Sequence, residues 1–187
     1  MAIIFNTSCT LNGFIADENH SLQWLFEVPG SQAAEEDFGN FLSKVSTIVM
    51  GSHTFEWMVN ELDLLNHPER WSDTYGDRPT WVFSSRELSL PAGAPITLIN
   101  APISEAIAEI QAANTSGGDI WIVGGGALAT QFYEAGALDR ITLTMAPVFL
   151  PAGKPVFTGL LESKNLHTAE VRRLGEFTEL TFEISKS

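Results

Sequence analysis

The stretch Ile120-Trp121-Ile122-Val123-Gly124-Gly125-Gly126-Ala127-Leu128-Ala129 decides the fold. Its first four residues are apolar and either β-branched or aromatic, which predicts a buried strand over 120–123. Three glycines follow, and an alanine-rich pattern typical of a helix then runs from 127 to 135. A strand that passes through glycines into a helix leaves backbone N–H groups free at the positive end of the helix, and no Cβ keeps a phosphate away. We therefore expect this turn to bind the pyrophosphate of a nucleotide cofactor.

The composition is that of an ordinary globular protein with an acidic surface. The chain has 187 residues, of which 44% are hydrophobic and 18% charged, which predicts one domain over residues 1–187 with a substantial core. Ten Lys and Arg residues stand against 23 Asp and Glu, and no basic cluster is present, which argues against nucleic-acid binding. No apolar run is long enough for a membrane span and no signal peptide begins the chain. We expect a cytoplasmic protein that binds neither nucleic acid nor membrane.

Cysteine and histidine give no metal-binding pattern. Cys9 is the only cysteine, and we expect it to be a small buried residue of the first strand rather than a reactive thiol. His20, His67 and His167 lie in polar segments, where surface positions are expected. The sequence therefore predicts no metal site.

Strands and helices alternate along most of the chain. Apolar and β-branched runs predict strands over 2–10, 47–50, 80–83, 96–99, 120–123 and 140–147. Helical spacing predicts helices over 31–44, 55–59, 105–113 and 127–135, while 11–16 and 61–79 are expected to be loops, the second with a helical turn. Segments 166–174 and 177–184 alternate with period two around Gly175-Glu176, which predicts an antiparallel hairpin. The pattern indicates a three-layer α/β fold with a mostly parallel central sheet, helices on both faces and a C-terminal antiparallel hairpin.

Three turns follow predicted strands of this sheet: Gly51-Ser52-His53-Thr54, Ser84-Ser85-Arg86 and Gly124-Gly125-Gly126. Each lies at the carboxyl end of its strand, where open α/β sheets bind ligands. The first offers a helix N-terminus with a hydroxyl and an imidazole, the second a guanidinium suited to a ribose phosphate, and the third bare amides. A Rossmann domain would also need an acidic residue about 20 positions after the glycines, but Thr144-Met145-Ala146-Pro147 contains none. We therefore expect the three turns to bind one nucleotide together, in a fold other than the Rossmann domain.

The order of these segments resembles the dihydrofolate reductase fold, and most closely its branch related to the C-terminal reductase domain of the riboflavin-biosynthesis protein RibD. The resemblance covers nearly the whole chain. It rests on the motifs Leu11-Asn12-Gly13-Phe14-Ile15-Ala16, Val49-Met50-Gly51-Ser52-His53-Thr54-Phe55-Glu56, Phe83-Ser84-Ser85-Arg86, Ile122-Val123-Gly124-Gly125-Gly126 and Gly153-Lys154-Pro155-Val156-Phe157. It implies an NADPH-dependent reductase that acts on a pterin-, pyrimidine- or related heterocyclic substrate, such as 5-amino-6-(5-phosphoribosylamino)uracil, and a homodimer, which is common in this branch.

The same resemblance implies cofactor-binding roles for the residues of the three turns. Near the cofactor's phosphates it places Gly51, Ser52, His53 and Thr54. Near the 2′-phosphate it places Ser84, Ser85 and Arg86. Beside the pyrophosphate and the nicotinamide it places Gly124, Gly125, Gly126 and Ala127. Ser52 stands where the family commonly has arginine, so one phosphate contact is missing.

On the substrate side, the resemblance implies a role for Asn12, which stands where many relatives have aspartate. In folate reductases the proton route runs through a carboxylate on the first long helix. Here that region carries Glu35, Glu36 and Asp37, and Asp37 is our candidate catalytic residue; the alternative is a solvent-exposed acid that interacts with the helix dipole. Candidates to line a flat substrate pocket, with core packing as the alternative, are Phe14, Trp24, Phe38 and Trp57.

Two hypotheses of different classes follow. The first is an NADPH-dependent reductase of a heterocycle. The second is a non-catalytic nucleotide-binding protein on the same fold, which Ser52 and Asn12 would suit.

Overall fold

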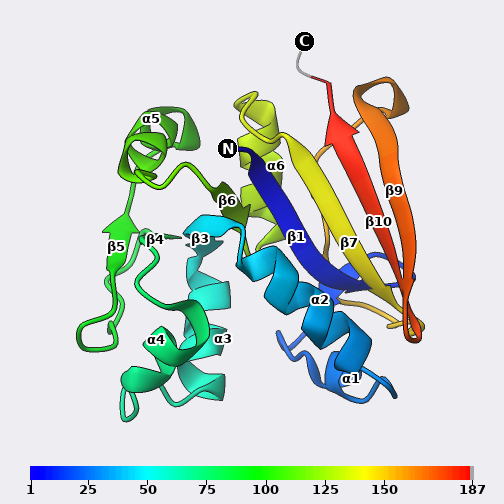
Figure 1. Cartoon of the computed structure of the whole chain (residues 1–187), viewed down its shortest axis with the longest axis horizontal. Coiled ribbons are helices and arrows are strands. Elements are labelled where there is room, and N and C mark those ends of the chain that lie inside the picture. Colours follow the sequence, from blue (N-terminus) through cyan, green and yellow to red (C-terminus); the bar gives the residue numbers. More distant parts are fainter. Residues whose placement is uncertain (186–187) are drawn as a thin grey trace.

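The computed structural model describes residues 1–185, which contain an eight-stranded central sheet (Figure 1). Its strands are β1 (Ile3–Thr10), β3 (Val45–Gly51), β4 (Thr80–Phe83), β5 (Ile96–Ile99), β6 (Asp119–Ile122), β7 (Arg140–Ala146), β9 (Leu166–Leu174) and β10 (Phe177–Ile184). Their order is β5-β4-β3-β6-β1-β7-β10-β9. Pairing is parallel from β5 to β7, and the hairpin of β9 and β10 adds two antiparallel strands at one edge. The predicted mostly parallel sheet with a C-terminal hairpin is confirmed.

Helices cover both faces of the sheet because neighbouring residues of its buried strands point to opposite sides. On one face, α3 (Ser52–Glu61) and α4 (Glu69–Tyr75) pack against side chains that include Ile48, Met50 and Trp121. On the other face, α5 (Ile103–Ala113) and α6 (Gly126–Glu134) pack against Val49, Ile120 and Ile122. Each fully buried aliphatic side chain contributes about 1.5–3 kcal/mol of transfer free energy. The strand that opens the glycine stretch is therefore a central structural element with cores on both sides.

The remaining elements include two short strands and one helix that the sequence analysis did not predict. Short strands β2 (Phe14–Ala16) and β8 (Lys154–Pro155) pair antiparallel, where 11–16 was expected to be a loop. A full helix, α4, forms within 61–79, because Trp71 and Tyr75 lie one turn apart and are both buried. The other elements are α1 (Gln23–Phe26), α2 (Gln32–Leu42) and the 3₁₀ helix η1 (Ser163–Asn165).

Glycines let three chain segments approach one another backbone to backbone. A Cβ on Gly153 would lie 2.3 Å from the carbonyl oxygen of Ala16, and one on Gly126 would lie 2.3 Å from that of Pro155. Between these contacts, the N–H of Val156 donates to the carbonyl of Gly13 at 2.9 Å. The segment that carries Lys154 is thereby held directly beside the glycine turn.

Cys9 lies inside the sheet, as predicted. Its side chain is 1% exposed on β1, and burial raises the pKa of its thiol to about 11. A thiol that stays protonated at neutral pH is a poor nucleophile, so Cys9 acts as a packed apolar residue.

Candidate active site

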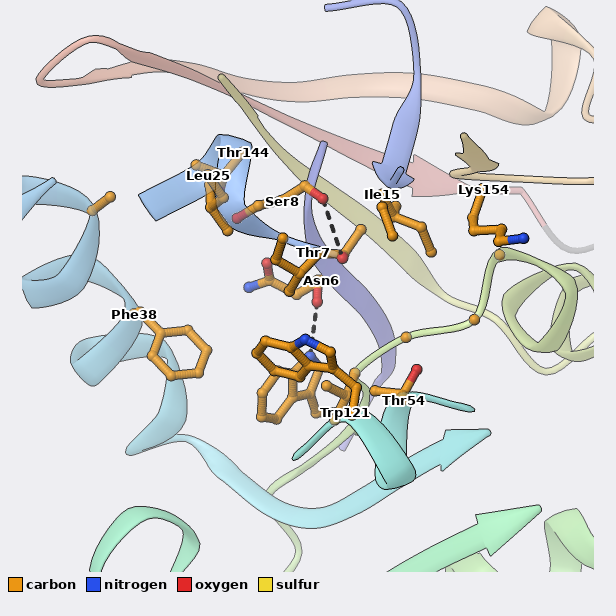
Figure 2. A pocket seen from close by; sticks show the side chains of 18 of the residues that line it. Asn6, Thr7, Ser8, Ile15, Leu25, Phe38, Thr54, Trp121, Thr144 and Lys154 are labelled. Atoms are coloured by element: carbon orange, nitrogen blue, oxygen red, sulfur yellow. Dashed lines mark hydrogen bonds between the residues drawn. The ribbon is translucent and has the colours of Figure 1, made fainter. Parts of the chain in front are cut away.

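A cavity of about 750 Å³ opens beside α2 at the carboxyl ends of the parallel strands. Its floor comes from β1, β6, β7 and β10, and its walls from α2, α3, the glycine turn and β8. In Figure 2, Phe38 lies on one side of the pocket and Ile15 and Lys154 lie on the other. No residue of α2 is buried, although Ala34, Phe38 and Phe41 form an apolar face. Ala34 and Phe41 also pack against neighbouring core residues, whereas Phe38, which is 39% exposed, borders the cavity and is available to a ligand.

Each position of the Gly124–Gly126 turn requires glycine for a separate structural reason. A Cβ on Gly124 would lie 2.9 Å from Oγ1 of Thr54, and Gly125 has a φ of +92°, which favours glycine. Gly126 contacts the backbone of Pro155, as described above. The glycines are thus required by packing within the protein as well as by any ligand. All three line the cavity together with Ala127.

Two helices begin side by side at this turn. The N–H of Gly51, which precedes α3, lies 3.4 Å from the carbonyl oxygen of Gly124, which precedes α6. Neither helix has a side-chain cap on its first N–H groups. His53 and Thr54 line the cavity, whereas Gly51 and Ser52 do not. Two uncapped helix N-termini at one rim favour an anion there.

The turn Ser84-Ser85-Arg86 lies at the same edge of the sheet but does not line the cavity. It follows β4, the neighbour of β3, and its backbone is fixed by the Ser84 hydroxyl, which accepts from the N–H of Arg86 at 3.0 Å. The Arg86 guanidinium donates to Glu56 of α3 at 2.8 Å, and its side chain is 54% exposed. The structure therefore brings the first and third turns together and places the second turn on the other side of α3.

Aromatic side chains form a slot between α2 and the sheet. Phe38 meets Trp121 edge to face, with ring centroids 5.4 Å apart, and Phe41 meets it at 5.5 Å. The indole N–H of Trp121 donates to the carbonyl of Asn6 at 2.9 Å, which fixes the ring (Figure 2). Trp57 also lines the cavity. Two of the predicted substrate-pocket residues, Phe38 and Trp57, therefore contribute to a pocket wall suited to a flat ring.

The floor of the cavity is polar, and the sequence analysis did not identify it. Asn6, Thr7 and Ser8 of β1 line it, together with Thr144 of β7 and Glu179 of β10 (Figure 2 shows the first four). Three consecutive polar residues after the apolar start of the strand, Ile3-Ile4-Phe5, were the available signal. They offer an amide and hydroxyls to a bound ring.

Asp37 lines the cavity but is already paired. Both of its carboxylate oxygens accept hydrogen bonds from Arg172 at 2.7 Å. The same guanidinium binds Glu179, whose second oxygen accepts from Thr144 at 3.2 Å. Hydrogen bonds to Asp37 and Glu179 raise the pKa of Arg172, which stays charged at every physiological pH. This ion pair removes the free carboxyl group that a proton donor at Asp37 would require.

Three other predicted substrate residues do not line the cavity. Asn12 braces a loop instead: its side chain donates to the carbonyl of Leu150 at 2.7 Å and accepts from Thr10 at 2.9 Å. Phe14 belongs to β2 and packs over Gly153. Trp24 is 8% exposed and packs in a small core with Phe177. The structure places these three side chains outside the cavity, where local packing and hydrogen bonding hold them.

Within residues 1–185, no three or more His, Cys, Asp or Glu side chains come together in a way that could hold a metal ion. None of the helices in that range has the length and apolar character needed to cross a bilayer.

Comparisons with known proteins agree with this architecture. The family model for the RibD C-terminal domain matches residues 1–180. Two Bacillus subtilis proteins are similar along their length: YyaP is 29% identical over 91% of this chain and 87% of its own, and YwjB is 27% identical over 92% of each chain.

Solved structures show the same fold. A protein from Shewanella sp. PV-4 that is named as a riboflavin biosynthesis protein superposes on this chain with a TM-score of 0.79 at 25% identity, covering 99% of both chains. Dihydrofolate reductase from Enterococcus faecalis, solved with NADP(H), gives a TM-score of 0.63 at 17% identity, covering 98% of this chain and 96% of its own. The family model covers nearly the whole chain, so this chain belongs to the RibD C-terminal domain family.

Proposed function

We propose that the protein is a reductase that uses NADPH to transfer hydride to a planar heterocyclic substrate. One observation carries the proposal: a single cavity joins two uncapped helix N-termini to an aromatic slot with a polar floor. The first end suits the phosphates of a dinucleotide, and the second suits two stacked rings.

The residues present fit a dinucleotide. The amides of Gly125, Gly126 and Ala127 and those of His53 and Thr54 would hold the diphosphate, because they are the free donors of α6 and α3. Arg86 would face the 2′-phosphate at the far side of α3. The bound nicotinamide supplies the hydride, and the protein's task is to position the ring and exclude water.

The substrate end favours a heterocycle with hydrogen-bonding edges, such as a pterin or a pyrimidine. Phe38 and Trp121 would contact its face, and Asn6, Ser8 and Thr144 would bind its polar edge. Proton delivery to the reduced ring would have to come from solvent or from a floor hydroxyl, because Asp37 is held by Arg172.

The ion pair of Asp37 with Arg172 favours a second candidate, a nucleotide-binding protein without turnover, because it leaves the site without a free carboxyl group at Asp37. The two are separated by following loss of absorbance at the reduced nicotinamide band with a panel of pterins, pyrimidines and related heterocycles. Oxidation of NADPH that depends on an acceptor supports the reductase. NADPH binding without turnover on the whole panel supports the second candidate.

Arg86→Ala is expected to weaken NADPH binding and to leave NADH binding nearly unchanged. The loss should be about 1.5 kcal/mol, or roughly tenfold in Kd, at the low end for a charged hydrogen bond because Arg86 is half-exposed and must leave Glu56. Fluorescence titrations with both nucleotides measure it. Arg173→Ala removes an exposed arginine from the hairpin and is the matched control. Equal weakening of NADPH and NADH by Arg86→Ala would contradict a contact with the 2′-phosphate.

A further inference from the structure

Three basic side chains meet at one rim of the cavity. They are His20 from the loop after β2, His53 from the first turn of α3 and Lys154 from β8. The two imidazole rings are stacked, with centroids 5.0 Å apart and planes inclined by 14°. The chain has only 10 Lys and Arg and a net charge of −13, so such a grouping is unusual for this protein.

No acidic side chain in residues 1–185 forms a salt bridge with any of the three. Asp17 lies on the same loop as His20, and its carboxylate acts to raise the pKa of the His20 imidazole. Its Oδ1 already accepts from the N–H groups of Asn19 and Ser21, both at 2.8 Å. A lysine and two imidazoles that lie together without a salt-bridged acid favour an anionic ligand, which stabilises their charged forms.

The loop presents His20 to the cavity by an uncommon backbone conformation. His20 has a φ of +63°, and the turn is closed by hydrogen bonds from His20 to Asp17 and from Asp17 to Ser21. Histidine and asparagine are among the non-glycine residues that tolerate this region. The conformation sets the imidazole against His53, across from the glycine turn that Pro155 contacts.

We propose that His20, His53 and Lys154 form an oxyanion site that binds a phosphate-ester group. The proposal rests on the proposed function and deepens it: Lys154 of β8, and His20 once it is protonated, add positive charge beside α3, where Ser52 provides none. The group bound is the diphosphate bridge of the dinucleotide or the phosphate of a phosphorylated sugar on the substrate, since both present the same oxygens.

Binding should depend on pH in one direction. Burial, Lys154 and His53 lower the pKa of His20, while Asp17 opposes them, so the free imidazole is mostly neutral at pH 7. A bound phosphate stabilises the imidazolium and raises that pKa in the complex. Binding therefore takes up a proton, and affinity should rise as the pH falls through the histidine range.

The test measures binding by tryptophan fluorescence for three ligands: NADP⁺, ribose 5-phosphate, and adenosine 2′-monophosphate, which carries the Arg86 phosphate but no diphosphate. The variants are Lys154→Gln and His20→Asn, which keeps a side chain suited to positive φ. Lys164→Gln is the control, since Lys164 is 71% exposed and pairs with Glu162. We expect Lys154→Gln to weaken NADP⁺ about tenfold to a hundredfold, with adenosine 2′-monophosphate and the control unchanged.

His20→Asn is expected to weaken NADP⁺ more at about pH 6 than at about pH 8.5, reducing the pH dependence of the wild type. If only ribose 5-phosphate binding falls in the variants, the site exists and serves the substrate. If neither NADP⁺ nor ribose 5-phosphate binding changes, the oxyanion site is wrong. If the wild type binds neither adenosine 2′-monophosphate nor NADP⁺, the proposal that NADPH is the cofactor is wrong. The effect of the variants on ribose 5-phosphate binding then still tests the oxyanion site.

Discussion

Gly126→Ala is expected to destabilise the fold by about 3 kcal/mol or more, because overpacking against backbone has no flexible side chain to absorb it. The new Cβ would lie 2.3 Å from the carbonyl oxygen of Pro155 and 2.7 Å from that of Val156. The clash would push the 153–157 segment away from the first turn of α6. We therefore expect both a lower free energy of unfolding in urea and a loss of nucleotide binding.

Gly39→Ala is the matched control for this change. Gly39 lies within α2, and a Cβ there would meet nothing within 4 Å. The same substitution should stabilise the protein by about 0.5–1 kcal/mol, the usual gain for replacing glycine inside a helix. Equal stability of Gly126→Ala and wild type would show that the close approach of α6 and β8 is wrong.

Arg172→Met is expected to destabilise the protein by about 3 kcal/mol at pH 7, because it leaves two carboxylates facing each other without their shared cation. Glu179 has a side chain only 6% exposed and Asp37 one that is 22% exposed. This loss of about 3 kcal/mol is at the low end of the range for breaking a buried ion pair, since the Arg172 side chain is 34% exposed. Urea unfolding monitored by tryptophan fluorescence measures the loss.

The neighbouring Arg173 gives the control for Arg172. Its side chain is 79% exposed and pairs with Glu176 across the hairpin turn at 3.4 Å. Exposed pairs contribute about 0–1 kcal/mol, so Arg173→Met should change stability little. If Arg172→Met were no more destabilising than Arg173→Met, the Asp37–Arg172–Glu179 network would not hold α2 to the hairpin.

The sheet and its helices were predictable because their signals are local. Runs such as Thr80–Phe83 and the segments around Gly175 carry period-two or continuous apolar patterns that identify strands without knowledge of the rest. The three turns were predictable for the same reason, since each directly follows a strand. Within the hairpin, even the pairing of Arg172 with Glu179 follows from its register.

The site itself depended on contacts between distant parts of the chain. Asp37 and Arg172 are 135 positions apart, so no local sequence pattern predicts their ion pair. His20 lies in a polar loop and is exposed, as predicted, yet the turn at Asp17 directs it to the cavity rim. Asn12 and Trp24 resemble pocket residues in composition, but long-range partners at Leu150 and Phe177 fix them in structural roles.

Tryptophan fluorescence during titration with NADPH tests the central claim most directly, because Trp57 and Trp121 line the cavity in which the nucleotide is proposed to bind. The account predicts saturable quenching by NADPH, weaker binding of NADH, and weaker NADPH binding in Arg86→Ala. Absence of quenching by both nucleotides at every concentration up to the millimolar range would contradict it.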